Sequence, residues 1–515
     1  MDSGLRLLVG GGVTARDRKL RLILFVAWLA LVSWFLSRHV LWRDEMRAFS
    51  LALSGSNLVE MFHHVHGEGH PLLWYLILRI GHDIFPYREV LPAAGFLISI
   101  AAMAVLTWTA PFRTIVIALI LFSFYGAFEF AVIARNYGIS MLVMFALAAL
   151  YGRVRNTLWF GYIILILCNT NVPSCIIAAG FMLFRFVELL TDKERPTRRD
   201  FLVFAGNALL ALLGAYLCFR TVYPTFNDAA VSRNLSDLSI ANVGRGLIDN
   251  EWGFSHLAFG TSVPFPLDAI LLAVSCIGLI RRPAALAAGL VTLIALKLFF
   301  YFVYYSYYRH EILYVIFLIS LYWMVAEGAG GRWRQPKWQD TVQFVGTAVF
   351  AGLLVLQCSG LLAPIHIEFV GVPFSHSAQV GALLKRPEFS NAIVTGDPDT
   401  MLEPVAYYAD NPIWFLRQQR FGRVVSLSKN DRHLLSMTDM LADAEKLHRQ
   451  TGRPVVILSH LQLQDKRVQK SRVMFGDATI LRPDEVRHFW ASTRLVAKLR
   501  PSASDEDYDV YVYPR

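Results

Sequence analysis

The sequence predicts a polytopic α-helical membrane protein of about eleven transmembrane helices, followed by an α/β domain outside the membrane. Of its 515 residues, 55% are hydrophobic and only 17% are charged, whereas soluble domains average about 45–50% apolar and about 25% charged residues. The apolar residues form long runs, such as 22–41 and 341–362, that can cross a bilayer. From about residue 363 the chain turns polar and alternates short apolar strands with a helix, which is typical of an α/β domain.

The first apolar run sets the orientation of the chain. Four basic residues precede it, namely Arg16, Arg18, Lys19 and Arg21. The run of about 20 residues is longer than the apolar core of a signal peptide, and no small-residue cleavage site follows it. We therefore expect a retained first helix whose N-terminal end lies in the cytoplasm.

The remaining spans follow from the positions of the apolar runs. They are expected at about 22–41, 89–109, 113–129, 137–151, 158–169, 173–190, 201–222, 266–280, 284–304, 311–327 and 341–362. The loops that this count places in the cytoplasm are 111–113, 152–156, 191–200, 281–283 and 330–338. All of them carry arginine or lysine, as the positive-inside rule requires, so the count places the C-terminal domain outside.

Two long loops are expected on the outer side, at 42–88 and 223–265. The stretch "HPLLWYLILRIGHDIF" in the first loop is not counted as a span, because that would place every later basic loop outside. Its aromatic and short apolar character predicts a helix that lies in the membrane interface. The predicted domains are a transmembrane domain, 1–362, and an extracytoplasmic α/β domain, 363–515.

Four strands and one helix are predicted in the polar C-terminal part. "NAIVTG", "GRVVSLS", "RPVVILSH" and "DYDVYVY" are short apolar runs typical of buried strands. "SMTDMLADAEKLHRQTG" predicts a helix with a serine or threonine cap and a terminal glycine.

The charge and the cysteines exclude two other classes of protein. The formal net charge of +10 comes from short loops between apolar runs, and no basic stripe with aromatic residues indicates nucleic-acid binding. The five cysteines lie in or beside apolar segments, which predicts buried thiols and not a disulfide framework.

An acidic pair follows the first span directly. Asp44 and Glu45 lie between Arg43 and Arg47 in "LWRDEMRAFSLA". Adjacent carboxylates at the outer membrane surface are candidates for proton transfer. The alternative is an ordinary helix start, where acids favour the N-terminal dipole.

A histidine-rich stretch, "MFHHVHGEGHPLLWY", comes next. A metal site would take its ligands from His63, His64, His66, Glu68 and His70, but their irregular spacing lacks the helical HExxH pattern. The alternatives are a solvated loop of neutral histidines and an anion site that uses His70.

Two later spans begin with charged and aromatic residues at the outer side. Arg135 and Tyr137 begin one of them, and Tyr308, Arg309 and His310 begin the other. Such residues are often membrane anchors. Together with the acidic pair, however, they form a set that suits phosphate binding and proton abstraction.

The Asp-x-Asp pattern in "TGDPDT", residues 395–400, follows a predicted strand. Some nucleotide-sugar enzymes bind a metal with this pattern. Because Pro398 separates the two acids, a turn is the preferred interpretation.

The order of these motifs resembles a known superfamily. A first span is followed by "RDEMRAFSLA", "GHPLLWYLIL", "ARNYGISML" and "YYRHEIL". This order is similar to the GT-C fold glycosyltransferases of the protein O-mannosyltransferase and lipid A aminoarabinose transferase superfamily, in particular to its uncharacterised bacterial branch. The resemblance covers residues 1–330. Where relatives often have "HPP" or a lysine before the proline, this chain has "HPL" with His70.

The resemblance implies an enzyme that transfers a sugar from a polyprenyl-phosphate donor to an acceptor on the non-cytoplasmic face. It implies that Asp44 deprotonates the acceptor hydroxyl, and that Glu45 orients the acceptor or tunes Asp44. The residues implied in binding the donor phosphate are His70, Arg135, Arg309 and His310. We further expect Arg47, Glu68, Tyr137 and Tyr308 to contact substrate. No cofactor is expected, with a divalent metal as the alternative.

Two functions of other classes remain open at this point. A transporter or flippase of a lipid-linked glycan would need polar groups near the bilayer midplane, whereas the informative charges here gather at the outer interface. A non-catalytic assembly protein could keep both the fold and the acidic pair. The sequence leaves the sugar unspecified, and the acceptor is a glycan, a lipid or a protein. A bacterial inner membrane is the expected location.

Overall fold

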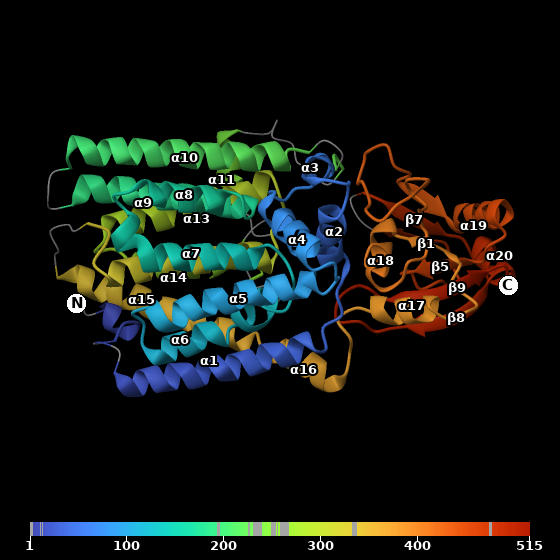
Figure 1. The fold of residues 1–515 in the computed structure, drawn as a ribbon, viewed down its shortest axis with the longest axis horizontal. Helices are drawn as coiled ribbons and strands as arrows, with labels where there is room; N and C mark the ends of the chain where they lie inside the picture. Colours follow the sequence, from blue (N-terminus) through green and yellow to red (C-terminus); the bar gives the residue numbers. More distant parts are fainter. Residues whose placement is uncertain are drawn as a thin grey trace.

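The computed structural model contains a bundle of long helices and a separate C-terminal domain (Figure 1). It describes all residues except 1–3, 11, 13, 193–195, 225–226, 230–238, 249–253, 255, 258–266, 332–336 and 473–475. Within this part of the chain, eight helices are long and apolar enough to cross a membrane. They are α1 (Ala15–Leu36), α5 (Val90–Thr109), α7 (Tyr137–Val154), α9 (Val172–Thr191), α10 (Arg198–Val222), α13 (Pro283–Phe302), α14 (Tyr308–Ala326) and α15 (Trp338–Ser359) with α16 (Leu362–Val370).

The fold class is confirmed, but three predicted spans are shorter than a membrane requires. They correspond to α6 (Thr114–Leu121), α8 (Leu158–Cys168) and α12 (Leu267–Ile277). After α6 the chain makes a π-helical turn, η2 (Tyr125–Glu129). A π-helical turn departs from the α-helical hydrogen-bond ladder, so the predicted span 113–129 is not one continuous helix.

The first helix begins earlier than predicted and includes its basic flank. Thr14 and Asp17 form a capping box that starts α1 before the basic residues. Arg21 is buried and donates hydrogen bonds to the carbonyl oxygens of Thr107 (3.0 Å) and Ala110 (3.2 Å). A charged side chain inside the helix thus satisfies carbonyl groups at the end of α5.

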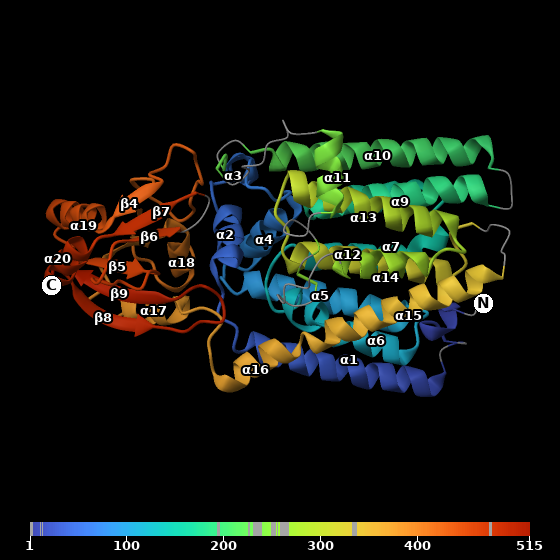
Figure 2. The same ribbon diagram turned by 180° about the vertical axis from the view of Figure 1, so that it is seen from behind.

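The position of each helix in the bundle follows from its apolar surface. The membrane-long window of α14 is 89% buried, whereas that of α10 is only 17% buried. A helix that is apolar on all sides belongs in the centre of a bundle, and α14 lies there in Figures 1 and 2. The exposed apolar side chains of α10, including Leu209, Leu212 and Tyr216, are in position to face lipid.

Three short helices separate the bundle from the C-terminal domain. They are α2 (Arg43–Ala52), α3 (Leu58–Val65) and α4 (Leu73–Ile84), and they lie between the two parts in Figure 1. The predicted helix of the first outer loop is α4, which buries Trp74 and Leu78 but exposes Ile80 and Ile84. Its exposed apolar side chains agree with the predicted contact with the membrane interface.

The second outer loop, 223–265, lies largely outside the described residues. The structure describes α11 (Ile240–Ile248) and a few further positions of this loop, among them 227–229. Residue 229 joins the loop to the C-terminal domain, because its backbone N–H donates to the carbonyl of Leu427 at 2.9 Å.

The C-terminal domain contains a six-stranded and a three-stranded sheet. The strand orders are β3-β2-β1-β5-β9-β8 and β4-β7-β6. The strands are β1 (Ile393–Asp397), β2 (Ile413–Phe415), β3 (Arg420–Phe421), β4 (Leu434–Ser436), β5 (Val455–Ser459), β6 (Gln469–Arg472), β7 (Ala478–Leu481), β8 (Arg494–Leu499) and β9 (Tyr508–Tyr513). The helical elements are α17 (Ser377–Leu384), η4 (Asp399–Leu402), α18 (Val405–Tyr408), α19 (Met437–Thr451) and α20 (Pro483–Ser492).

Three of the four predicted strands are present, as β1, β5 and β9. The predicted helix is α19, which begins with a capping box of Ser436 and Asp439 and ends at Gly452 with φ of 68°. The fourth strand, "GRVVSLS", is wrong: the segment forms no strand. Its backbone N–H groups bind side chains from elsewhere instead, since Val425 donates to Glu403 and Leu427 donates to Asn227.

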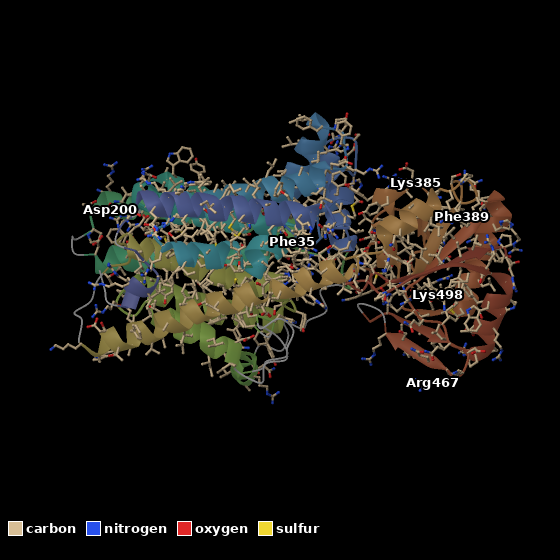
Figure 3. The ribbon with its side chains drawn as sticks, turned by 90° about the horizontal axis from the view of Figure 1, so that it is seen from below. Phe35, Asp200, Lys385, Phe389, Arg467 and Lys498 are labelled. Carbon is tan, nitrogen blue, oxygen red and sulfur yellow. The ribbon has the colours of Figure 1, made fainter. Side chains whose placement is uncertain are left out.

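The predicted domain boundary at residue 363 falls within helix α16. Helix α16 still packs on the bundle, where the rings of Phe369 and Trp34 are 5.8 Å apart. Gly371, with φ of 77°, then ends the helix, and the chain enters the C-terminal domain. In Figure 3, Asp200 marks the end of the bundle that is farthest from this domain, and Lys385 lies within the domain.

Candidate functional site

The predicted catalytic carboxylate lies between two arginines from distant parts of the chain. Asp44 is the second residue of α2, and its carboxylate is 3.1 Å from Nη2 of Arg309 and also forms an ion pair with Arg135. Arg135 precedes α7, and Arg309 lies in the first turn of α14. The folding of three separate elements therefore brings together three of the predicted site residues.

The side chain of Asp44 remains partly accessible, with 27% of its surface exposed. Burial alone would raise the pKa of Asp44, but Arg135 and Arg309 outweigh that effect and hold this pKa well below its usual range. Asp44 is therefore ionised at neutral pH, and its basicity is weak as long as both arginines contact it.

His70 lies on the other side of Arg135. Its Nε2 atom is 3.1 Å from Nη2 of Arg135. Burial, together with the charge of Arg135, lowers the pKa of His70 to about 3, so the ring is neutral and accepts a hydrogen bond from the guanidinium. His70 thus orients one of the two arginines, and a direct contact with donor phosphate stays a prediction.

Two glycines let the chain in the histidine-rich stretch change direction and enter the site. Gly67 and Gly69 have φ of 92° and 90°, a conformation that side chains disfavour. The turn directs Glu68 towards Arg47 and His70 towards Arg135. His63 and His64 are exposed instead. In the described part of the chain, no three His, Cys, Asp or Glu residues are arranged to hold a metal ion.

Glu45 faces away from Asp44 and is completely buried. Its carboxylate accepts hydrogen bonds from the backbone N–H groups of Ala134 (2.6 Å) and Trp42 (3.2 Å), and it lies 2.9 Å from Nε2 of His39. Because Ala134 precedes Arg135, Glu45 fixes α2 relative to one of the arginines that contact Asp44. Its two predicted roles, orienting the acceptor and tuning Asp44, both stay predictions.

Aromatic residues and a histidine support the two arginines. The Tyr137 hydroxyl is 2.8 Å from Nε2 of His310, and both residues are buried. Nδ1 of His310 accepts the backbone N–H of Tyr307 at the start of α14. This arrangement holds the first turn of α14, where Arg309 lies. The predicted substrate residue Tyr308 instead donates to Gln357 of α15 at 2.6 Å.

Arg47 and Glu68 lie in a junction with the C-terminal domain. Arg47 bonds Glu68 at 2.5 and 2.8 Å and Glu403 at 2.6 Å. Asn227 of the second outer loop donates to Glu68 at 2.7 Å and accepts from Leu427 at 3.0 Å. The predicted contact of Arg47 and Glu68 with substrate stays a prediction, and their observed contacts join four segments of the protein.

A second junction begins one turn earlier in α2. The Arg43 guanidinium bonds Asp505 at 2.5 and 2.9 Å, and its backbone N–H donates to Glu506 at 2.7 Å. Helix α2 therefore presents Asp44 to the bundle, and Arg43 and Arg47 to the C-terminal domain. The position of the candidate catalytic carboxylate is thus fixed from both sides.

The sequence prediction missed three neighbours of the site. Trp42 lies beneath the Arg309 guanidinium, which is 5.6 Å from its ring. Glu129 is near enough to Arg309 and Arg135 for its charge to interact with both. Its signal was a single acid within an apolar run, which is characteristic of functional positions in membrane proteins. Glu403 gave no such signal, because its partner Arg47 is far away in the sequence.

The fold and these contacts define a polytopic membrane protein that holds a carboxylate between two arginines where its helix bundle meets an α/β domain. No protein-family model matches the chain, and neither does any curated protein.

Among solved structures, the chain is similar to ArnT from Cupriavidus metallidurans, a lipid A aminoarabinose transferase of the GT-C fold. The structure bound to undecaprenyl phosphate is 16% identical, with a TM-score of 0.49 over 95% of this chain and 97% of that one. The apo structure is also 16% identical, with a TM-score of 0.48 over 96% and 97%. Because identity and TM-scores are low, the roles of the site residues rest on the contacts within this chain.

Proposed function

We propose that this protein is a membrane glycosyltransferase that transfers a sugar from a polyprenyl-phosphate donor to an extracytoplasmic acceptor. The observation that carries the proposal is the pairing of Asp44 with Arg135 and Arg309 at the end of the bundle next to the C-terminal domain. A partly exposed carboxylate suits proton abstraction, and two guanidiniums suit a phosphate. The ligand of one solved ArnT structure, undecaprenyl phosphate, belongs to the same chemical class as the proposed donor.

In the proposed mechanism, the donor phosphate binds between Arg135 and Arg309 and takes over their hydrogen bonds. The phosphate in a polyprenyl-phosphate sugar carries one negative charge, and it gains a second when the glycosidic bond breaks. The arginines therefore stabilise the transition state more than the bound donor. Loss of their contacts raises the pKa of Asp44 towards its ordinary value, so donor binding makes this carboxylate a better base.

The transfer step follows from this arrangement. Asp44 accepts the proton of the acceptor hydroxyl, whose oxygen forms a bond to the anomeric carbon of the sugar. The bond between that carbon and the phosphate oxygen breaks, and its electron pair leaves with polyprenyl phosphate. The transition state has oxocarbenium character, and attack opposite to the phosphate inverts the anomeric centre. Asp44, Arg135 and Arg309 together account for the proton and for the leaving charge.

The proposed location is a bacterial inner membrane, with the N-terminal end in the cytoplasm and the C-terminal domain outside. The basic residues Arg198 and Arg199 at the start of α10 support this orientation, because Asp200 beside them lies at the end of the bundle opposite the C-terminal domain (Figure 3). The excess of basic residues favours the cytoplasmic side. The site next to the C-terminal domain then faces extracytoplasmic acceptors.

The test is sugar transfer by the full chain in membranes that are supplied with a panel of radiolabelled polyprenyl-phosphate sugars. We expect Asp44→Asn to reduce transfer at least about 100-fold, as for the loss of a general base. Asp83→Asn is the matched control, because Asp83 is 54% exposed and, among the described residues, its carboxylate pairs with Arg79 of the same helix and no other. If the Asp44→Asn variant transferred sugar as fast as the wild type, the assignment of Asp44 as the base would be refuted.

The same assay addresses the metal alternative and the other functional classes. Resistance of transfer to a chelator is the expected result, because two arginines can stabilise the leaving phosphate. Complete inhibition that a divalent ion reverses would instead make the enzyme metal-dependent. If a reconstituted wild type moves the labelled donor across vesicles without transferring its sugar, the protein is a transporter and the proposal fails.

A further inference from the structure

The C-terminal domain contains a pocket that extends along one edge of its six-stranded sheet. Its volume is about 610 Å³, within the range of small-ligand sites of roughly 300–1,000 Å³. It is formed by α20, by the edge strand β8 and its neighbour β9, and by the segment 462–464. Helix α20 and the C-terminus lie at the end of the molecule farthest from the bundle (Figure 1). None of the residues that line the pocket belongs to the Asp44 site, so the two sites are separate.

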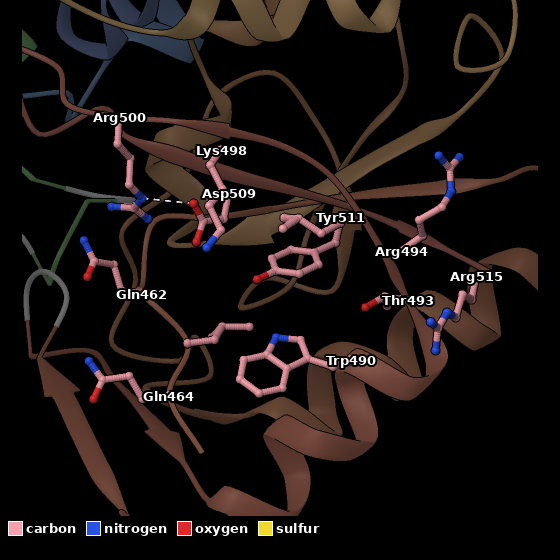
Figure 4. Close-up of a pocket in the computed structure, with 12 residues that line it drawn as sticks. Gln462, Gln464, Trp490, Thr493, Arg494, Lys498, Arg500, Asp509, Tyr511 and Arg515 are labelled. Atoms are coloured by element: carbon pink, nitrogen blue, oxygen red, sulfur yellow. Dashed lines mark hydrogen bonds and ion pairs between the residues drawn. The ribbon is translucent and has the colours of Figure 1, made fainter. Parts of the chain in front are cut away.

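Two aromatic rings lie in the middle of this pocket. Figure 4 shows Trp490 of α20 next to Tyr511 of β9, with polar residues on both sides of the pair. Trp490 is 36% exposed, whereas Tyr511 is nearly buried and packs edge-on against Phe489 at 5.1 Å. An aromatic ring that is held on one side and exposed on the other offers a flat apolar face to a ligand.

The polar lining is basic and rich in amides. Arg494 and Lys498 are exposed and have no side-chain hydrogen bond or ion pair within the described part of the chain. The single carboxylate side chain of the lining, Asp509, is occupied by Arg500 at 3.0 Å. Gln462 and Gln464 add donors and acceptors beside the aromatic pair, on the side where Lys498 also lies. The side chains of Arg494 and Lys498 are thus available to bind an anionic ligand.

The strand next to the pocket is poorly suited to pair with an added peptide strand. Strand β8 is the edge of the six-stranded sheet. Its register shifts between Leu495 and Ala497, and Lys498 lies on it. Bulges and lysines are the features by which edge strands resist pairing with another chain. A compact ligand with hydroxyl groups fits this setting better than an extended peptide.

We propose that this pocket binds an anionic saccharide. Trp490 stacks on a sugar ring, the glutamine amides bond its hydroxyl groups, and Arg494 and Lys498 neutralise its acidic group. The proposal is independent of the transfer reaction, because it concerns only the C-terminal domain and holds for an enzyme or a binding protein.

The test is isothermal titration calorimetry of the full chain in detergent with tri-galacturonic acid, and with maltotriose, tri-glutamate and inorganic phosphate for comparison. We expect saturable binding of the acidic trisaccharide that weakens with salt, with maltotriose at least tenfold weaker. Lys498→Glu and Trp490→Ala should each weaken it at least tenfold. Arg449→Glu, on a 72% exposed residue of α19 outside the pocket, is the charge-matched control and should leave it unchanged.

Several results would overturn the proposal. They are the absence of saturable binding to the acidic trisaccharide, equal binding of tri-glutamate or of phosphate alone, and binding that neither pocket variant changes. If Trp490→Ala lowers the melting temperature of the domain, Lys498→Glu decides alone, because the Lys498 side chain is exposed and makes no hydrogen bond or ion pair to any described residue. None of these results depends on sugar transfer by Asp44.

Discussion

Asp44 and Asp397 are both carboxylates held by arginine, but the two regions around them differ. Asp397 accepts from Nε and Nη2 of Arg417 at 2.9 and 2.7 Å and also from Thr479, and only 1% of its side chain is exposed. Asp44 contacts Arg135 and Arg309, and 27% of its side chain is exposed. The first carboxylate is enclosed by its partners, and the second can exchange its partners for a ligand.

The same contrast applies to the two acidic motifs in the sequence. In "TGDPDT", Asp399 accepts the backbone N–H groups of Leu416 and Arg417 at 2.8 and 3.0 Å, so both acids of the motif stabilise the fold, in a strand end and a 3-10 turn. In "RDE", only Glu45 is enclosed in this way, and Asp44 keeps an accessible surface. Accessibility, and not the presence of an arginine, separates the candidate site from a structural ion pair.

The largest expected effect is a loss of stability when the enclosed ion pair of Asp397 and Arg417 is broken. Arg417→Met leaves the buried charge of Asp397 without its cation, which should cost about 3–5 kcal/mol of stability. Denaturant unfolding of the purified protein, followed by a probe in the C-terminal domain, measures it. Arg432→Met is the control, because Arg432 is 47% exposed and 3.6 Å from Asp443, so its loss should cost less than about 1 kcal/mol. Equal costs for the two variants would contradict the enclosed role of Asp397.

The next effect tests the open pair through activity. Arg309→Gln removes one of the two guanidiniums proposed to hold the leaving phosphate, and should slow transfer by about 10²–10³-fold, as for the loss of one stabilising donor. Arg38→Gln, at an exposed residue that follows α1, should slow transfer less than twofold. The transfer assay in membranes measures both rates. If the Arg38→Gln variant transferred sugar more slowly than the Arg309→Gln variant, transfer would depend on positive charge near the membrane surface in general and not on the contact of Arg309 with Asp44.

A smaller effect concerns pH and the two junctions on the other face of α2. Each junction has two carboxyl groups for one arginine, namely Glu68 and Glu403 with Arg47, and Asp505 and Glu506 with Arg43. Burial raises the pKa of Glu403 to about 7 and that of Glu506 to about 8, although the arginines oppose the shift.

The direction of the pH effect follows from these raised pKa values. Between the ordinary value of 4.5 and about 8, the folded state binds more protons than the unfolded state, so stability falls as pH rises. Differential scanning fluorimetry from pH 5 to 9 should show this decline, and Glu403→Gln with Glu506→Gln should flatten it. An unchanged slope in the double variant would place the titrating groups elsewhere.

The smallest effect is expected at the exposed histidines. His63→Asn together with His64→Asn should change stability by less than about 0.5 kcal/mol, because the exposed side chains lie outside the site. Transfer should remain within twofold of the wild type, in the same membrane assay with and without chelator. A large loss of activity that added metal restores would revive the metal interpretation of this stretch.

The sequence alone determined the parts that depend on local pattern. Long apolar runs identified all eight of the membrane-long helices, because burying backbone in lipid requires about 20 apolar residues in a row. Capping residues identified α19, and short continuous apolar runs identified β1, β5 and β9. The same patterns singled out Asp44, Arg135 and Arg309 as charges at the ends of apolar segments.

Only the tertiary structure decided how these charges are shared. Adjacent residues of α2 point in different directions, so Asp44 meets Arg135 and Arg309, Glu45 is enclosed, and Arg47 reaches Glu403 in another domain. No local pattern encodes such partners, since they come from segments that meet only after the bundle and the C-terminal domain have packed together. For the same reason "GRVVSLS" forms no strand, because its N–H groups bind the side chains of Glu403 and Asn227.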